Sequence, residues 1–310
     1  MAFIKNIIKK FARTVAKNVN INVQNIEYNN ETEKLAIGSL LSMQQRLFDS
    51  NNINDYEFKI FSQWGDDGII QYLIKYINIE NKTFIEFGVE DYLESNTRFL
   101  MMNNNWKGFV MDSSVEYMEK LKNQSWYWKY SLKNNAIFIT KENINQLLAE
   151  TGYKNIGLLH IDIDGNDAHI LETLDLSKIN PSIIIMEYNA VFGKERTISI
   201  PYDKDFYRTE KHYSNLYYGA SLPALVYIAN SKGYRLICCN IAGNNTYFVR
   251  KDLLNNKIKE KTIGEAYKIS NFRESRNEDY TLSYMDGEER LEIIKEMDVI
   301  NVKTKEIEKL

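Results

Sequence analysis

Cysteine, proline and long apolar runs are all scarce in this chain of 310 residues, which contains 2 Cys and 3 Pro. The two cysteines, Cys238 and Cys239, are neighbours in the sequence. This arrangement excludes a disulfide framework and a zinc site built from several cysteines. No run approaches the ~18 consecutive apolar residues that a membrane-spanning helix needs. We therefore expect a cytoplasmic protein in a reducing compartment.

An excess of charge of one sign is also lacking, because 39 Lys and Arg residues stand against 42 Asp and Glu residues. This balance predicts no nucleic-acid partner. Residues 1–20 are the exception, since they hold five basic residues and no acidic one, and helical spacing puts Phe3, Ile7 and Phe11 on one face. Two interpretations stay open. Such a helix lies peripherally on an anionic membrane surface, or it packs on its own domain or on a second copy in a homo-oligomer.

From Phe58 onward, strand-like and helix-like patterns alternate. The strand-like runs are apolar throughout, which is typical of strands covered on both faces in a parallel sheet between helices. The expected strands are residues 83–87, 108–111, 136–139, 157–163, 182–186, 234–240 and 246–250. The expected helices between them are residues 66–76, 95–102, 114–122, 142–151, 167–174 and 220–231.

The turn at residues 242–245 predicts that the last two strands form an antiparallel hairpin. Five parallel strands, a helix and a terminal hairpin are the element order of the Rossmann-like, seven-stranded methyltransferase sheet. We therefore predict an α/β fold of this type, with helices on both faces, over residues 58–251. Residues 1–57 are an N-terminal lead-in, residues 188–218 an insertion that caps the substrate site, and residues 252–310 a charged helical tail.

Polar residues at strand ends are the first candidates for a site, because ligands bind beyond the carboxyl ends of parallel strands. The first strand ends with Glu86 and Gly88, and the second ends with Asp112. An acid roughly 20 residues after a glycine turn can accept hydrogen bonds from the ribose of an adenosine. This spacing favours a nucleoside-containing ligand.

The fourth and fifth strands end in a dense group of oxygen ligands. Asp162 and Asp164 are two residues apart, so their side chains are expected to converge, and Glu187 and Asn189 follow the neighbouring strand. Asp164, Glu187 and Asn189 would form an all-oxygen site suited to Mg²⁺. The alternative has no metal, with Asp162 bonded to loop or ligand amides and Asp167 capping the next helix.

Four segments resemble FkbM-type S-adenosylmethionine-dependent methyltransferases, and the resemblance is closest to members found in bacterial surface-glycan biosynthesis. These segments are residues 61–68, 84–97, 161–167 and 183–189, and the likeness covers about residues 58–251. The sequence departs from the family in the glycine loop, where Glu90 and Tyr92 stand at places that are often glycine.

The resemblance implies a set of contacts to S-adenosylmethionine. Glu86 and Gly88 would line its methionine part, Asp112 its ribose, and Thr140 or Glu142 its adenine. In the same comparison Asp162 would face the sulfonium, and Gln63 would reach the same pocket.

Methyl transfer needs an acceptor oxygen held in line with the sulfonium methyl, and a base or metal for the hydroxyl proton. Asp164 and His212 are the candidate catalytic residues. Tyrosines at or within the insertion are the candidate contacts to the acceptor: Tyr188, Tyr202, Tyr213 and Tyr218. We expect O-methylation of a sugar or related hydroxyl of a surface glycan or its precursor, with a carbohydrate or small molecule as acceptor.

Other functions fit parts of the same pattern. The sequence Asp162-Ile163-Asp164-Gly165 after an apolar strand also occurs in metal-dependent phosphatases, and an Asp-x-Asp pair can hold a metal and a nucleotide sugar in a glycosyltransferase. A non-catalytic scaffold that keeps the methyltransferase fold is a third alternative. Binding of the cofactor separates the first prediction from these.

Overall fold

A computed structural model describes residues 29–272 and 274–310. The amphipathic helix expected at residues 1–20 lies outside these described residues. In the described part of the chain, no helix combines the length and the apolar character required to cross a membrane.

Ten strands form two sheets. They are β1 (Asn81–Phe87), β2 (Lys107–Asp112), β3 (Leu132–Ala136), β4 (Ile156–Ile161), β5 (Ile183–Glu187), β6 (Ile198–Ser199), β7 (Tyr234–Cys239), β8 (Asn245–Arg250), β9 (Asp298–Asn301) and β10 (Ile307–Lys309). The large sheet has the order β3-β2-β1-β4-β5-β8-β7, and a small sheet has the order β10-β9-β6. In the large sheet, β8 runs antiparallel to both of its neighbours, β5 and β7, and is the one strand whose direction is reversed. The predicted seven-stranded, mostly parallel sheet with a C-terminal hairpin is thus confirmed.

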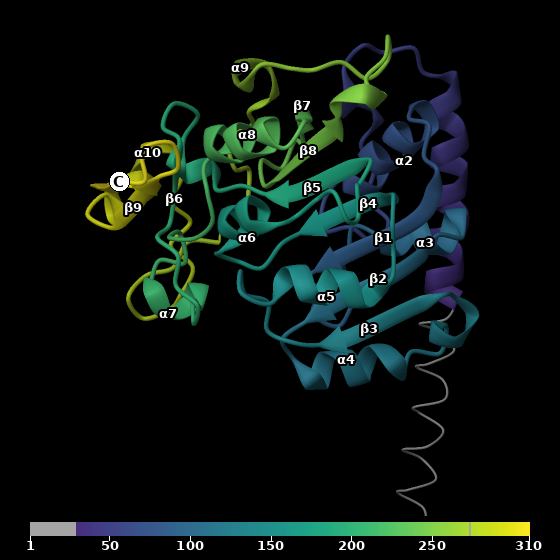
Figure 1. The fold of residues 1–310 in the computed structure, drawn as a ribbon, viewed down its shortest axis with the longest axis horizontal. Helices are drawn as coiled ribbons and strands as arrows, with labels where there is room; N and C mark the ends of the chain where they lie inside the picture. Colours follow the sequence, from purple (N-terminus) through teal and green to yellow (C-terminus); the bar gives the residue numbers. More distant parts are fainter. Residues whose placement is uncertain (1–28, 273) are drawn as a thin grey trace, which may run out of the picture.

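Helices cover both faces of the large sheet (Figure 1). Residues 29–44 are helical. The other α-helices are α2 (Asp66–Tyr76), α3 (Arg98–Asn104), α4 (Val115–Lys122), α5 (Ile144–Thr151), α6 (Asp167–Thr173), α7 (Arg208–Lys211), α8 (Leu222–Ser231), α9 (Ile263–Ala266) and α10 (Gly287–Ile294). Short 3-10 turns are η1 (Gln45–Leu47), η2 (Ile53–Tyr56), η3 (Tyr127–Lys129), η4 (Ala190–Phe192) and η5 (Lys251–Leu253).

Two hydrophobic cores lie on the two faces of the sheet. Residues of α5, α6 and α8 pack on one face, and residues of α2, α3 and α4 pack on the other. Every residue of β4 and β5 is buried, as expected for central strands with helices on both sides. This stack brings the carboxyl ends of β1, β4 and β5 to one edge of the sheet.

The expected third strand was placed too late in the sequence. We predicted residues 136–139, but β3 is Leu132–Ala136. This strand lies at the edge of the sheet and carries exposed Lys133, so it lacks the continuous apolar run used to find the others. The apolar residues after it, Ile137 to Ile139, instead turn toward the carboxyl edge.

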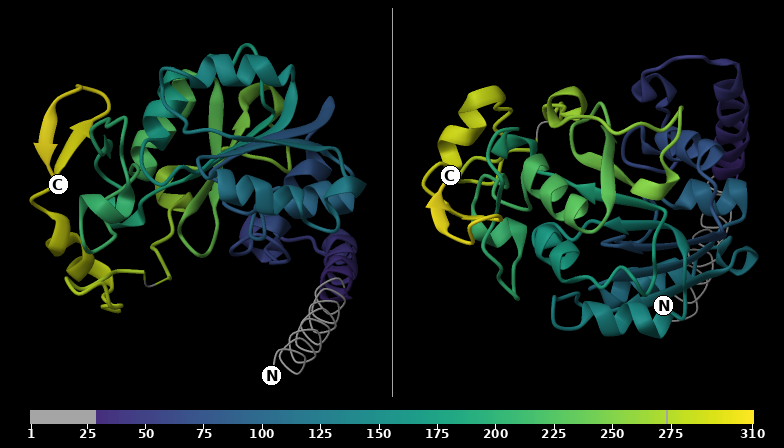
Figure 2. Two further views of the ribbon diagram at one scale, coloured as in Figure 1. Left: turned by 90° about the horizontal axis from the view of Figure 1, so that it is seen from below. Right: turned by 45° about the horizontal axis from the view of Figure 1, so that its top comes forward.

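The segment expected as a charged tail takes part in a second, smaller unit. Strand β9 of this tail pairs with β6 of the insertion, and a third core joins Ile198 and Phe206 to Ile294 and Val299. Figure 2 shows this unit and the helix of residues 29–44 at opposite ends of the molecule. The insertion and the tail therefore build one wall together at the carboxyl side of the sheet.

Candidate active site

A cavity of about 390 Å³ opens at the carboxyl ends of β1, β4 and β5. We call it the acidic cavity, because seven of its lining residues are carboxylic acids: Glu86, Glu90, Glu94, Asp162, Asp164, Glu187 and Glu274. Its basic lining residues are His160 and Arg208. A smaller cavity of about 80 Å³ lies next to it, with Asp112, Ile137, Phe138 and Ile163 in its wall. Gly88 lines both cavities, so they adjoin at the end of β1.

Gly88 is required by the packing of two neighbouring strands. Its φ is +69°, and a Cβ on it would lie 1.6 Å from the carbonyl oxygen of Asp162. Its amide donates to the carbonyl of Met111 at 2.9 Å. No L-residue with a side chain fits here without moving the end of β4. The glycine thus positions the loop between the two cavities.

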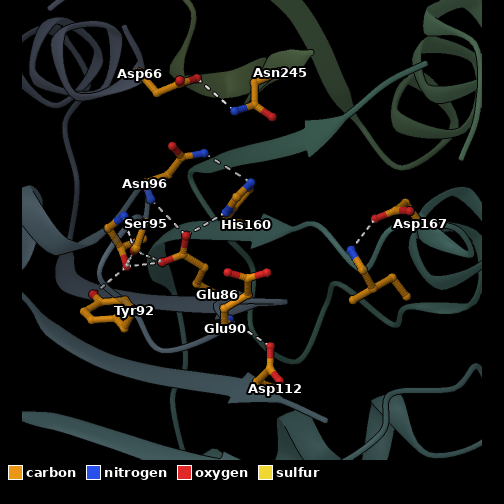
Figure 3. Close-up of polar contacts among 12 residues, drawn as sticks. Asp66, Glu86, Glu90, Tyr92, Ser95, Asn96, Asp112, His160, Asp167 and Asn245 are labelled. Atoms are coloured by element: carbon orange, nitrogen blue, oxygen red, sulfur yellow. Dashed lines mark hydrogen bonds and ion pairs between the residues drawn. The ribbon is translucent and has the colours of Figure 1, made fainter. Parts of the chain in front are cut away.

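Glu86 and His160 form a buried ion pair in the wall of the acidic cavity (Figure 3). The Nδ1 of His160 lies 2.9 Å from Oε1 of Glu86, and this carboxylate also accepts from the hydroxyl of Ser95 and the amide of Asn96. Burial alone would raise the pKa of Glu86, but the hydrogen bond and charge of His160 outweigh it and lower that pKa. Burial likewise opposes the charge of His160, and Glu86 outweighs it and raises the pKa of the imidazole. The pair is therefore held in its charged form.

Asp112 holds the loop that follows β1. Its Oδ2 accepts from the amide of Glu90 at 2.8 Å (Figure 3). Its Oδ1 accepts from the amide of Ser114, also at 2.8 Å. Glu90 and Tyr92 have positive φ values of 47° and 63°. The loop thus keeps the left-handed conformations that glycine favours, although these two positions carry side chains.

Three carboxylates meet at the ends of β4 and β5. One oxygen from each of Asp162, Asp164 and Glu187 lies within 4.8 Å of the others. Glu187 is 8% exposed, and its Oε2 has no hydrogen-bond partner among the described residues. Burial and the charge of Asp164 raise the pKa of Asp162 to about 8, and burial and the charge of Asp162 raise the pKa of Glu187 far above its usual range. This group can bind a cation or share a proton.

Arg208 of α7 joins this cluster to the tail. Its guanidinium donates to Asp164 at 2.9 Å and also pairs with Glu274. Its Nε donates to the carbonyl of Asn215, and its Cζ lies 3.5 Å from the ring centroid of Tyr218. The side chain is only 10% exposed. Arg208 thus fixes the wall that the insertion and the tail form at the acidic cavity.

The structure places part of the predicted site around these cavities. Six of the predicted residues line the acidic cavity: Gln63, Glu86, Gly88, Asp162, Asp164 and Glu187. Asp112 lines the small cavity. Thr140 and Glu142 line neither of them, because β3 ends three residues earlier than expected and Ile137 to Ile139 stand at the strand end instead.

Asn189 and His212 lie apart from the carboxylates. The amide nitrogen of Asn189 donates to the carbonyls of Leu216 and Tyr218, and its oxygen accepts from the amide of Val191, so the side chain is fully used within the chain. His212 bonds Ser214 through Nδ1 at 2.7 Å and does not line the acidic cavity. The structure does not bring either residue to the cluster.

The four predicted tyrosines also lie outside the lining of the acidic cavity. Tyr188 is fully buried and donates to the carbonyl of Lys268. Tyr202 donates to Glu142. Tyr213 lies against His212, and Tyr218 packs under Arg208. Their roles in the structure are in packing and in support of the cap.

Several residues of the acidic cavity are not among those predicted from the sequence. Arg208, Phe272 and Glu274 come from the insertion and the tail, whose position relative to the sheet no local pattern predicts. Trp64 lies beside Gln63, and its ring stacks on Phe272 with centroids 5.7 Å apart. Ser95 and Asn96 are part of the segment 84–97 that resembles the family, so that likeness was the available signal.

The strand order, with one reversed strand, and the cavities at its carboxyl edge define a methyltransferase-type α/β fold. Residues 110–236 match the family model of the methyltransferase FkbM domain, from β2 to the first part of β7. This part of the chain is therefore similar to an FkbM methyltransferase domain. The comparison with curated proteins gave no match.

Solved structures of methyltransferases show weak likeness to the chain. TrmK of M. capricolum with S-adenosyl-homocysteine is 13% identical, with 63% of this chain and 73% of that chain covered and a TM-score of 0.36. An O-methyltransferase from Bacillus cereus, also with S-adenosyl-homocysteine, is 10% identical, with 70% and 90% covered and a TM-score of 0.38. A methyltransferase from Clostridium acetobutylicum is 9% identical, with 59% and 89% covered and a TM-score of 0.37. The strand order of the sheet itself, rather than these likenesses, establishes the fold.

Proposed function

We propose that this protein is an S-adenosylmethionine-dependent O-methyltransferase acting on a hydroxyl of a sugar or related acceptor. The observation that carries the proposal is the buried Oε2 of Glu187, which has no hydrogen-bond partner within residues 29–272 and 274–310. It lies beside Asp162 in a cavity that adjoins a small, partly apolar one. A methyltransferase needs both parts, because one holds the cofactor and the other receives the hydroxyl proton of the acceptor.

The two cavities suit the two halves of the cofactor. Ile137, Phe138 and Ile163 give the small cavity the apolar surface that an adenine ring requires. Asp112 lies beside them, and each of its oxygens, although it accepts one amide, keeps a lone pair for a ribose hydroxyl. The methionine part then passes Gly88 into the acidic cavity, where carboxylates face its sulfonium and its ammonium.

The acceptor hydroxyl would lie next to Asp162 and Glu187. With a pKa of about 8, Asp162 is partly deprotonated near neutral pH, so it can take a proton in the transition state. Arg208 holds Asp164 at the edge of the same group. The rate of methyl transfer should therefore rise as the pH increases through about 8.

A Mg²⁺ ion fits the same three carboxylates. Asp162, Asp164 and Glu187 offer an all-oxygen donor set with one buried oxygen that has no other partner among the described residues. When bound, the ion would lower the pKa of the acceptor hydroxyl and orient its oxygen. This set replaces the predicted one, since Asp162 stands where Asn189 was expected.

A surface glycan or its precursor remains our proposed acceptor class, with the reaction in the cytoplasm. The support is the resemblance of four segments to members of the FkbM family from glycan biosynthesis. A phosphatase or a glycosyltransferase would use the Asp162 and Asp164 pair without a cofactor in the small cavity. A scaffold would bind no cofactor at all.

Calorimetric titration of the full chain with S-adenosyl-homocysteine tests the proposal. We expect saturable heat that Asp112→Ala weakens at least tenfold, because the ribose loses its acceptor. Asp205→Ala, in an exposed loop of the insertion, is the matched control and should leave the affinity unchanged. Absence of heat, together with absence of a thermal shift, would overturn the methyltransferase proposal.

A further inference from the structure

A second large cavity, of about 440 Å³, lies beside the edge strand β7 and is lined by other residues than the acidic cavity. We call it the lysine cavity, because four lysines line it: Lys257, Lys259, Lys261 and Lys268. Glu265 is the one acidic residue in its lining. The methyltransferase chemistry proposed above uses none of these residues.

Three of the lysines lie on one side of an extended segment, because the side chains along it point alternately toward the cavity and away from it. Between Lys257 and Lys261, every second residue lines the cavity. The residues between them face the other way, since Ile258 is fully buried in the core and Glu260 pairs with Arg235 at 3.6 Å. The ammonium groups are therefore presented together to one volume.

Hydrogen bonds fix this segment against the sheet. The side-chain oxygen of Asn255 accepts from the amides of Lys257 and Ile258, at 2.9 and 3.0 Å. The amide of Lys261 donates to the carbonyl of Leu236 in β7 at 2.8 Å. The backbone supporting the lysines is thus ordered before any ligand arrives, which reduces the entropy lost on binding.

The fourth lysine comes from a different part of the tail. Its carbonyl accepts from the hydroxyl of the fully buried Tyr188 at 2.6 Å. Its ammonium lies close enough to Glu57 to lower that residue's pKa, although burial raises that pKa more strongly. The backbone of Lys268 is therefore held by a buried side chain of the core, and the residue lines the same cavity as the alternating lysines.

Positive charge in this cavity is poorly compensated. Lys257 pairs with Asp49 at 3.0 Å, but Asp49 is 91% exposed. The carboxylate of Glu265 accepts from the amide and the hydroxyl of Thr262 in a capping box. Within the described chain, Lys259, Lys261 and Lys268 form no ion pair with an acid. Three ammonium groups around one cavity repel each other unless an anion lies between them.

We propose that the lysine cavity binds a diphosphate group. Two adjacent phosphates offer several anionic oxygens, which three or four ammonium groups can contact together, whereas a single monovalent anion would leave most of the charge unpaired. Lysine is a compact point charge that suits phosphate. The volume is in the range of small-molecule sites, and the chain as a whole has a net charge of −3, which does not favour a long nucleic-acid partner.

Calorimetric titration of the full chain with inorganic pyrophosphate tests this inference. We expect saturable binding at low salt that weakens as salt is added, and tighter binding than that of inorganic phosphate or sulfate. The double variant Lys259→Gln/Lys261→Gln should weaken pyrophosphate binding roughly tenfold or more. Its melting temperature, measured in parallel, verifies that it is folded.

A charge-matched variant supplies the control. Lys133→Gln/Lys154→Gln removes two exposed lysines elsewhere on the surface and should leave the affinity for pyrophosphate unchanged. Equal weakening in both double variants, or equal affinity for pyrophosphate and sulfate, would show only general attraction to anions and would overturn the inference. So would the absence of any heat with pyrophosphate.

Two further probes distinguish the sources of the diphosphate. Uridine diphosphate represents a soluble nucleotide, and farnesyl diphosphate represents a lipid carrier. If one of these two ligands binds more tightly than pyrophosphate, the cavity also recognises its nucleoside or its lipid part. If all three bind equally, the cavity recognises the diphosphate alone.

Discussion

The acidic cavity and the lysine cavity gather charge of opposite sign by different means. In the first, Asp162 and Glu187 stand at the ends of β4 and β5, where burial and the neighbouring charges raise the pKa of both. Lysines of the second project from a tail segment alongside β7, and three of the four are exposed. Burial therefore favours the protonated forms of these two acids, whereas exposure keeps the lysines available for an ionic ligand.

Replacing Gly88 should have the largest effect, and it should act first on the acidic cavity. We expect Gly88→Ala to lower the free energy of unfolding by ~3 kcal/mol or more, because the added Cβ collides with the carbonyl of Asp162 and φ is positive. Chemical denaturation measures this loss. The control is Gly264→Ala in α9, where a Cβ meets nothing within 4 Å. A similar loss in both variants would contradict the explanation.

Arg208→Met should destabilise the protein by ~2 kcal/mol, because it leaves Asp164 and Glu274 without their cation in a partly buried wall. Adding Glu274→Gln to this variant should restore part of the loss, since one unpaired acid is then removed. Denaturation of the single and double variants measures the coupling. Arg250→Met, which breaks an exposed pair with Asp252, should lose at most ~1 kcal/mol. No recovery in the double variant would rule out the charge argument.

The pH dependence of stability should separate the two cavities. A buried acid whose pKa is raised is protonated in the folded protein and ionised in the unfolded chain, so stability falls as pH rises from about 4 to about 8. Asp162→Asn should remove a slope of roughly 1 kcal/mol per pH unit over this window. Unfolding measured at pH 5, 6, 7 and 8 without added metal tests it.

Lys259→Gln serves as the control for this slope. Lys259 lines the lysine cavity and not the acidic one, so the slope should match that of the unaltered protein. An unchanged slope in Asp162→Asn would show that folding does not raise the pKa of Asp162, and a rise of the rate through about pH 8 could then not be assigned to this residue.

The smallest effects are those of two ligands, Mg²⁺ in the acidic cavity and pyrophosphate in the lysine cavity, which should stabilise the protein independently of each other. At a Mg²⁺ concentration ten times its dissociation constant, the protein should gain ~1.4 kcal/mol. We expect Glu187→Gln to lose this gain but to keep the stabilisation by pyrophosphate. Lys259→Gln/Lys261→Gln should show the reverse pattern. Thermal unfolding of the unaltered protein and the two variants with each ligand measures all six shifts. A variant that loses both stabilisations would show that the cavities are not independent.

The sequence predicted the elements whose signals are local. Helix α2 spans the predicted residues 66–76, and the buried strands β4 and β5 lie within two residues of their predicted bounds. Both strands are apolar because helices cover both faces of the sheet, so their composition predicts their burial. The edge strand β3 lacks this apolar composition, so its bounds were predicted wrongly. The residues expected at the adenine, Thr140 and Glu142, were counted from those bounds and were therefore wrong as well.

The site was predictable only where one strand end supplies it. Glu86 and Glu187 lie within the last two residues of β1 and β5, Gly88 and Asp162 directly follow β1 and β4, and all four line the acidic cavity. Arg208 and Glu274 come from segments 66 residues apart that meet through the small sheet and its core. The two segments come together because β6 pairs with β9, and neither segment contains a local sequence pattern that predicts this pairing.

Residues 268–272 run from one cavity to the other, with Lys268 in the lining of the lysine cavity and Phe272 in that of the acidic cavity. Along this stretch the amide of Asn271 donates to the carbonyl of Ala242, and Gly243 packs against the carbonyl of Ile269. Hydrogen exchange at these few amides therefore gives a single reporter that either ligand should slow. It would register occupancy of each cavity in one experiment, without any knowledge of the acceptor.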